Sequence, residues 1–264
     1  MSESKLSWPL KLWVGLVILL LVAPALVVIP VSFGASNSFV FPPKEWSLRW
    51  YENFFTSPQW TSSLINSLQV ALLAALLATV VGLFAAIGLQ RKFKGAAALS
   101  GALLSPQIVP GIVVAIAIYI TFLGLHLNGT MIGFIIAHAV IGLPFVIITV
   151  STSLANFDRT LETASSSLGA TPFTTFRKVT LPLLMPGVAS GFVFAFVSSF
   201  DEVVIAIFLQ TPSLRTLPVQ MFESITLQID PTIAAASSLI VVVTTAILFA
   251  WHFASQSNRK KVKQ

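Results

Sequence analysis

Cysteine is absent from this chain of 264 residues, and only 9% of the residues are charged. Without cysteine there is no disulfide framework, no thiolate metal site and no thiol nucleophile. Soluble globular domains carry roughly a quarter charged residues, so the low charge excludes that class. The remaining composition, 56% hydrophobic residues with a mean hydropathy of +0.91, predicts an integral membrane protein.

Catalytic motifs are missing as well. The sequence has no G-x-x-x-x-G-K-[ST] phosphate loop, so this chain is not expected to hydrolyse ATP itself. It has neither the H-E-x-x-H motif of metalloproteases nor the G-x-S-x-G motif of serine hydrolases. We therefore expect no catalytic residue, metal or cofactor in the chain. The net charge of +6 does not indicate nucleic acid, because Lys and Arg occur in short clusters beside apolar runs, as is typical of membrane topology.

Six apolar runs are each long enough to cross a bilayer as a helix, which takes about 20 residues. The first has 22 residues, whereas a cleavable signal peptide has an apolar core of about 7 to 15 residues, so this run is predicted to remain as a span. The predicted fold is all-α with six membrane-spanning helices and both termini on one side. The runs cover residues 12–33, 62–89, 96–122, 130–154, 183–209 and 232–254.

The distribution of Lys and Arg predicts the orientation, because cytoplasmic loops carry an excess of these residues. With both termini in the cytosol, twelve basic residues lie inside and three outside. The inner set is Lys5, Lys11, Arg91, Lys92, Lys94, Arg159, Arg177, Lys178, Arg259, Lys260, Lys261 and Lys263; the outer set is Lys44, Arg49 and Arg215.

The predicted organisation has three parts. Residues 1–60 form the first span and an external segment, residues 61–255 form a core of five spans with a cytosolic loop at 155–182, and residues 256–264 form a basic cytosolic tail. The external segment, residues 34–60, is rich in Trp, Tyr and Phe, which suits the membrane interface. Docking of a partner is the alternative for that segment.

Two carboxylates lie within an apolar run, Asp201 and Glu202. An ionised carboxylate at the bilayer centre costs roughly 3 kcal/mol or more, so both are expected to face away from lipid. On a continuous helix they lie roughly 8 Å from the middle of the span, toward the outer face. Adjacent residues point about 100° apart, so one can line a cavity while the other bonds a neighbouring helix. A purely structural pair held by a partner subunit is the alternative.

Three other polar residues occur in the spans. Gln107 lies between Pro106 and Pro110, where prolines free backbone carbonyls that can line a cavity; a packing kink is the alternative. His138 and His252 have no carboxylate or second histidine at metal-binding spacing. We interpret both as hydrogen-bonded packing residues rather than as ligands or proton carriers.

The longest polar interval on the predicted cytosolic side covers residues 161–182. Residues 162–168 are predicted to form two turns of helix. Glycine is favoured directly after a helix end and proline at the first position of a helix, so Gly169 is expected to end this helix and Pro172 to begin the next. Such a short helix is marginal in water and needs a partner surface. An ordinary loop between spans is the alternative.

The same interval resembles the "EAA" coupling loop of permeases from binding-protein-dependent ABC importers. The pattern of that loop is Glu-Ala-Ala, three residues, Gly, nine residues, an aliphatic residue, one residue, Leu-Pro. The chain departs at the start, where the three motif positions are Thr163, Ala164 and Ser165 and the carboxylate of Glu162 is one residue upstream. The positions that match are Gly169, Val179, Leu181 and Pro182, with Leu168 and Ala170 beside the glycine.

A second resemblance, to the spermidine and putrescine branch of these importers, is carried by residues 199–204 and 216–218, with the sequences SFDEVV and TLP. Relatives in that branch often carry an acidic pair at this place. The resemblance implies a type I ABC importer permease in a bacterial inner membrane, with residues 61–255 as the permease core. Together with the residues described above, we expect a substrate pathway that includes Gln107, Ser199, Asp201 and Glu202.

The resemblance also implies the partners: a second, homologous permease subunit, an ATPase homodimer that holds ATP with magnesium, an external solute-binding protein and the lipid bilayer. Contact with the ATPase is expected from residues Glu162, Thr163, Ala164, Gly169, Ala170, Pro172, Leu181 and Pro182. The solute stays open among polyamines and other small amines or zwitterions, such as aminophosphonates and opines.

Two other classes remain open. A secondary transporter would carry protons on Asp201, Glu202 and His138, and would usually show an internal repeat of broken helices, which we do not find in the sequence. A purely structural membrane subunit would leave the two carboxylates unexplained.

Overall fold

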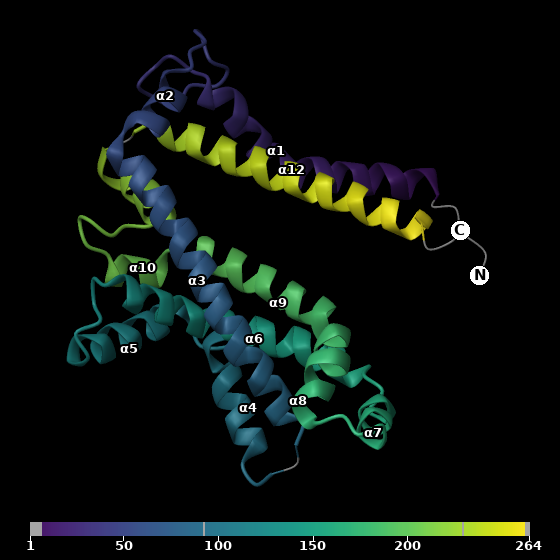
Figure 1. Cartoon of the computed structure of the whole chain (residues 1–264). Helices are drawn as coiled ribbons and strands as arrows, with labels where there is room; N and C mark the ends of the chain where they lie inside the picture. Colours follow the sequence, from purple (N-terminus) through teal and green to yellow (C-terminus); the bar gives the residue numbers. More distant parts are fainter. Residues whose placement is uncertain (1–6, 92, 229, 262–264) are drawn as a thin grey trace. The chain divides into compact units, whose positions relative to one another are not determined.

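The computed structural model describes residues 7–91, 93–228 and 230–261, and it describes side chains in these ranges except for residues 228 and 247–261. The secondary structure in these ranges is helical, apart from two isolated β-bridges (Figure 1). The chain divides into two compact units, Met1–Thr61 with Met221–Gln264, and Ser62–Gln220.

The first unit contains α1 (Trp8–Ser32), α2 (Arg49–Thr56) and α12 (Thr232–Lys261). The C-terminal part of α1 packs against α12, whereas residues 8–22 of α1 are exposed, and α2 also packs against α12. The Tyr51 hydroxyl in α2 lies 2.6 Å from Ser32 Oγ and donates to Ser238 Oγ at 3.2 Å, so it connects all three helices. Asn53 adds a bond of 2.7 Å to Thr232 Oγ1.

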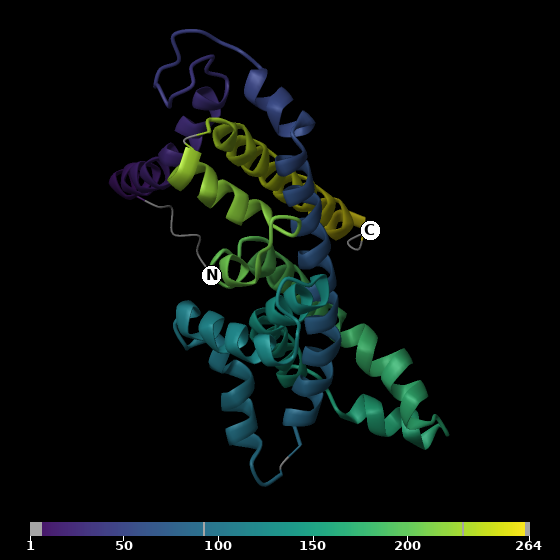
Figure 2. The same cartoon turned by 90° about the vertical axis from the view of Figure 1, so that its left-hand side faces the viewer.

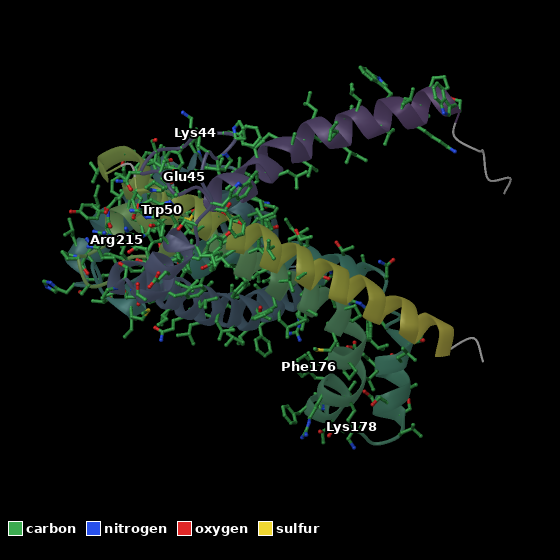
Figure 3. The ribbon with its side chains drawn as sticks, turned by 90° about the horizontal axis from the view of Figure 1, so that it is seen from above. Lys44, Glu45, Trp50, Phe176, Lys178 and Arg215 are labelled. Carbon is green, nitrogen blue, oxygen red and sulfur yellow. The ribbon has the colours of Figure 1, made fainter. Side chains whose placement is uncertain are left out.

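The segment between α1 and α2 is tied down by aromatic and backbone contacts. The Trp50 indole N–H donates to the Gly34 carbonyl at 2.8 Å, and Arg49 donates to the Ala35 carbonyl while its guanidinium lies 4.3 Å from the Trp50 ring centroid. Lys44 and Glu45 belong to this segment and are labelled in Figure 3. A surface cavity of about 340 Å³ lies here, lined by Gly34, Ala35, Ser36, Val40, Pro43, Lys44 and Glu45.

The core of the second unit is the packing of α6 (Met131–Ala155) against α9 (Leu181–Phe200), with α3 (Pro58–Leu89) alongside. Val146 and Val150 on α6 and Leu184 on α9 are fully buried there. Small residues permit the close approach, because glycine lets two helix backbones come together in a membrane.

The third predicted span is not one helix. It consists of α4 (Ala96–Leu104), a 3₁₀ turn (Ser105–Gln107) and α5 (Gly111–Gly124), and the two halves are bent by 104° (Figure 2). Proline has no N–H to donate, and it disfavours helical geometry in the residue before it. Pro110 therefore ends the first half and becomes the N-cap of α5. Of the two expectations for the prolines in 96–122, a broken helix and a packing kink, the structure shows the break.

The fifth predicted span is also broken. Its main part, α9, ends at Phe200, and α10 (Val204–Leu209) follows after three residues. At the other end α9 continues backward through a π-helical turn (Phe176–Thr180) into α8 (Pro172–Thr175). After α10 come α11 (Leu217–Glu223) and a second π-helical turn (Ser224–Gln228).

Four helices of the described chain are long and apolar enough to span a membrane: Trp8–Ser32, Pro58–Leu89, Met131–Ala155 and Pro172–Phe200. The bent pair of α4 and α5 makes a fifth if it is counted as one span. The apolar part of α12 whose side chains are described, Thr232–Ala246, is shorter than these four helices. The backbone of α12 is helical to Lys261, beyond the end predicted at residue 254. Six spans therefore stay a prediction. His252 lies in the part of α12 whose side chains are not described.

We predict that the contact of α6 with α9 depends on Gly187 and Gly191. A Cβ at Gly191 would lie 2.6 Å from Thr149 Oγ1 and 2.9 Å from Val146 Cα, and a Cβ at Gly187 would lie 2.8 Å from the Thr149 carbonyl oxygen. Such overpacking costs about 1 to 3 kcal/mol. Gly187→Ala and Gly191→Ala should therefore lower the unfolding temperature measured in detergent.

Gly88→Ala is the matched control, because a Cβ at this helical glycine meets no atom within 4 Å. The control should unfold at the same temperature as the unchanged chain or slightly above it, since alanine favours a helix over glycine. Equal unfolding temperatures for all three variants would contradict the proposed packing constraint.

Candidate functional site

The two acidic residues lie at the break between α9 and α10. The Asp201 N–H donates to the Val197 carbonyl at 3.0 Å, which closes the last turn of α9, and the Asp201 side chain is exposed. The half-buried Glu202 places its carboxylate Oε1 2.7 Å from the N–H of Ile205, so it caps the start of α10. The prediction that both project from one continuous helix is wrong; one follows the end of a helix and the other precedes the start of the next.

His138 connects α6 to the end of α9. Its side chain is fully buried, and Nδ1 lies 3.1 Å from the Ser199 carbonyl oxygen and 2.9 Å from Ser199 Oγ. The Phe134 ring lies against the imidazole, with ring centroids 5.8 Å apart. Among the described side chains, Nε2 of His138 has no hydrogen-bond partner. Ser199 is thus attached to α6 two residues before Asp201, in agreement with our interpretation of His138 as a hydrogen-bonded packing residue.

The two broken helices meet on α6. The turn that contains Gln107 packs on α6, and so do α9 and α10. The short helices after each break, α5 and α10, also pack together, with Tyr119 and Phe208 at a ring distance of 5.9 Å. The Gln107 side chain itself is exposed in its turn. The structure thus attaches both interrupted segments to one helix.

Arg215 is held by two side-chain amides after α10. Its Nε donates to Gln210 Oε1 at 3.1 Å and its NH1 donates to Gln220 Oε1 at 3.0 Å (Figure 3 labels Arg215). The Asn66 amide of α3 donates to the Arg215 carbonyl at 3.1 Å. These bonds fix the segment between α10 and α11, and no motif in the sequence predicted them.

The polar loop has the predicted helix, glycine and second helix. It contains α7 (Thr160–Ser167) and then Gly169 at φ +83°, a left-handed conformation that glycine adopts without strain. The Gly169 N–H donates to the Ser166 carbonyl and the Ala170 N–H to the Ser165 carbonyl, the bond pattern of a Schellman C-cap. Pro172 is the first residue of α8, as predicted. In Figure 1, α7 lies beside α8.

The start of α7 carries an acidic residue with a perturbed pKa. The backbone N–H of Thr160 donates to Asp158 Oδ1 at 2.9 Å, and this bond, together with one from the Thr160 side chain, lowers the pKa of Asp158 below its ordinary value. The carboxylate is therefore ionised at neutral pH, and its negative charge interacts favourably with the positive, N-terminal end of the α7 dipole. Because the folded-state pKa is lowered, this stabilisation is lost as the pH falls through that value.

Two side-chain bonds tie α7 to the segment before α9. Thr180 Oγ1 donates to Glu162 Oε1 at 2.7 Å, and the hydroxyls of Ser165 and Thr175 lie 3.0 Å apart. Phe176 stacks on Phe84 of α3 with ring centroids 6.1 Å apart, and Figure 3 shows Phe176 and Lys178 on the same turn. The sequence resemblance indicated Glu162 but gave no signal for Thr175 or Thr180.

The outer surface of the loop is apolar at two positions. The Leu168 side chain is 89% exposed and the Phe173 side chain is 70% exposed. Thr163 and Ala164, at the motif positions, are exposed on α7, whereas Ala170 is half-buried; Leu181 and Pro182 form the first turn of α9. Exposed large apolar side chains on a short helix pair are typical of a surface that a partner covers.

The described residues therefore form apolar helices with two interruptions and a glycine-containing loop between short helices. The family model described as "Binding-protein-dependent transport system inner membrane component" matches residues 78–261, which is more than half of the chain. The chain belongs to this family, whose members are inner-membrane permease subunits of ABC importers.

Curated relatives match over most of the chain. It is 31% identical to the putrescine transport system permease protein PotI of Escherichia coli (strain K12) over 252 residues, 92% of this chain and 89% of the relative. It is 31% identical to the spermidine/putrescine transport system permease protein PotC of Haemophilus influenzae over 87% of this chain and 92% of the relative. It is 32% identical to PhnV of Salmonella paratyphi A, a putative 2-aminoethylphosphonate transport system permease protein, over 78% of both.

Solved structures share the fold. A chain of a bacterial ABC transporter involved in the import of the acidic polysaccharide alginate superposes with a TM-score of 0.72 at 14% identity, over 93% of this chain and 94% of that chain. A chain of the methionine ABC transporter MetNI in an inward-facing conformation superposes with a TM-score of 0.60 at 18% identity, over 75% of this chain and 94% of that chain.

We predict that Glu202 stabilises the break through its cap rather than through its charge alone. Glu202→Ala removes the acceptor for the Ile205 N–H and should lower the free energy of unfolding by about 1 to 2 kcal/mol, as the loss of a helix cap does. Glu202→Gln keeps an oxygen at the same place and should lower it by less. Thermal unfolding in detergent measures both, and an equal loss in the two variants would contradict the cap.

Proposed function

We propose that this chain is the membrane-spanning permease subunit of an ATP-driven importer that moves a polyamine, such as spermidine or putrescine, from the exterior to the cytoplasm. The observation that carries this proposal is the acidic break at Asp201 and Glu202 in a chain that matches putrescine and spermidine/putrescine permeases along most of its length. The PhnV likeness supports a small zwitterionic amine as the second candidate solute.

The acidic break supplies negative charge where a helix is interrupted. Asp201 is exposed directly after α9, and the Glu202 carboxylate is fixed by its bond to the Ile205 N–H. A cation is attracted to such a pair more strongly in a low-dielectric channel than in water. The site should bind its solute weakly, because selection belongs to the external solute-binding protein. Ser199 and Gln107 belong to the same proposed pathway.

The proposed assembly follows from the family and from the positive charges. The chain has six spans with cytosolic termini in a bacterial inner membrane, and α12 forms the sixth. It pairs with a second, homologous permease subunit beneath the solute-binding protein. Two copies of an ATPase, which bind ATP with magnesium, lie under the loops that contain α7. The exposed Leu168 and Phe173 side chains support contact with a partner at this loop.

The proposed coupling is mechanical. Closure of the ATPase pair on ATP displaces α7, and the displacement passes through α8 and the π-helical turn into α9, whose far end carries the acidic break. Continuity of the helical backbone from Pro172 to Phe200 supports this transmission. Arg177 and Lys178 lie on the π-helical turn and contact either the ATPase or lipid phosphates.

We predict that the charges of the acidic break select for cations. The double variant Asp201→Asn, Glu202→Gln keeps the side-chain shapes and an acceptor for the α10 cap, so it should assemble normally. Loss of both charges should reduce polyamine uptake about tenfold at subsaturating solute, which corresponds to ~1.4 kcal/mol of electrostatic attraction.

Uptake of labelled spermidine and putrescine into vesicles measures this effect. Glu45→Gln is the control, because it removes one exposed carboxylate in the predicted external segment. A double variant that assembles and transports at the full rate would remove the substrate role of the break.

We predict that Gly169 is required for coupling. Gly169→Val places a β-branched residue in a left-handed conformation, which costs about 1 to 2 kcal/mol and should distort the turn between α7 and α8. The ATP hydrolysed per solute molecule transported should rise several-fold. Gly95→Val is the matched control, since Gly95 has φ +94° and equally open surroundings outside the loop.

The complex for this measurement is obtained by co-purification in mild detergent, which should recover an ATPase and a different permease chain. Failure to recover either would contradict the proposed assembly. Unchanged coupling in Gly169→Val would contradict the mechanical role of the turn, and uptake by vesicles that contain this chain alone would contradict an ATP-driven importer.

A further inference from the structure

Glu162 lies on the inward face of α7. Along this helix the half-buried residues are Glu162 and Ser165, which are three positions apart and therefore share one face. Both have hydroxyl partners in the segment before α9: Thr180 for Glu162 at 2.7 Å and Thr175 for Ser165 at 3.0 Å. The carboxylate of Glu162 thus faces the loop's own second half.

Thr180 is a structurally fixed partner. Its side chain is 4% exposed, and it occupies the last position of the π-helical turn, directly before the first residue of α9. A hydroxyl that donates to a carboxylate at 2.7 Å forms a charge-assisted bond, which is stronger than a bond between neutral groups. The bond therefore connects the first turn of α7 to the start of α9, across 18 residues of chain.

The outward face of α7 has a different character. Thr163, Ser166 and Ser167 are exposed, and the hydroxyls of Ser166 and Ser167 donate to carbonyls of their own helix, those of Glu162 and Thr163, at 2.9 and 3.0 Å. Thr160, Thr163, Ala164, Ser166 and Ser167 carry no charge, so this surface is neutral. A partner that covers α7 meets hydroxyl, methyl and apolar groups there rather than a carboxylate.

We infer that Glu162 is a positioning residue of the coupling loop: its carboxylate fastens α7 to the start of α9 through Thr180, so that α7 and α9 move as one body. This inference rests on the proposed function for the source of the motion. It assigns to Glu162 a contact within this chain, in place of the charged contact with the ATPase that its nearness to the motif position suggests.

Four variants separate the two roles. Thr180→Val deletes the donor with little change in shape, Glu162→Ala deletes the acceptor, Glu162→Gln removes the charge but keeps an oxygen, and the fourth combines Glu162→Ala with Thr180→Val. The measured quantity is ATP hydrolysed per solute transported, in the complex co-purified with its partners. The control is Thr152→Val, which removes an exposed hydroxyl that bonds only within α6.

Thr180→Val and Glu162→Ala should each raise the ATP spent per solute about threefold, as expected for loss of one partly solvated charge-assisted bond. The combined variant should show the same increase rather than the product of two, because both changes remove one bond. Glu162→Gln should retain most of the coupling because it keeps an oxygen that can accept from Thr180. Thr152→Val should retain all of it. If Glu162→Gln uncouples as strongly as Glu162→Ala while Thr180→Val does not, the inference is overturned in favour of a charged contact with a partner.

A second measurement needs no ATPase, so its result tests the bond between Glu162 and Thr180 whether or not the proposed function is correct. Because the chain lacks cysteine, Ser166→Cys and Leu183→Cys can be spin-labelled together without background; both positions are exposed, on α7 and α9. The distance distribution between the labels should be narrow with the native bond and with Glu162→Gln, and broad with Glu162→Ala or Thr180→Val. Equally narrow distance distributions in all four backgrounds would overturn the inference. If Thr180→Val does not fold, the comparison of Glu162→Ala with Glu162→Gln is sufficient to test it.

Discussion

The constraint on which the rest of this structure depends is the need to satisfy backbone donors and acceptors wherever a membrane helix is interrupted. A continuous helix satisfies its own backbone, whereas each break frees N–H and C=O groups that lipid cannot bind. At the break after α9, the Glu202 carboxylate accepts from the Ile205 N–H and His138 contacts the Ser199 carbonyl. At this break the Glu202 carboxylate thus takes the place of a missing helical acceptor.

The α6 helix provides the surface on which both interruptions rest. It packs against α9 over its length, carries His138 toward Ser199, and contacts the Ser105–Gln107 turn of the other broken segment. Close approach depends on glycine, because Gly187 and Gly191 face Thr149 and neighbouring atoms of α6 with no room for a Cβ. Packing and hydrogen bonding therefore support each other: the small residues bring the helices close enough for one imidazole to reach across.

Local signals in the sequence predicted local structure well. Gly169 and Pro172 determine a helix end and a helix start through their own backbone geometry, and both predictions are confirmed. The break at Asp201 was not predicted, because no glycine or proline occurs at 201–203 and an apolar run shows no periodicity that could reveal where its helix stops. At the other interruption, Pro106 and Pro110 indicated a broken or kinked helix but not the angle of the bend.

Long-range partners explain the rest of the gap between the sequence and the site. The local sequence around Thr180 does not indicate that its hydroxyl donates to Glu162, because the two residues are 18 positions apart and the bond requires the turn at Gly169. The same holds for His138 and Ser199, 61 positions apart. The two charges within an apolar run located the acidic pair in the sequence. The position of these side chains between two separate helices could be seen only in the folded structure.

The π-helical turn at Phe176–Thr180 sets the angular register between the loop and the membrane helix. Such a turn holds one residue more than an α-helical turn of the same rise. The π-helical turn takes up its extra residue without rotating its flanks, whereas deleting one residue from the first α-helical turn of α9 would rotate everything before it by about 100° around the helix axis. Phe176 would then leave Phe84, and α7 would face another direction. The spacing between Gly169 and Pro182 is consequently a matter of angle as much as of length.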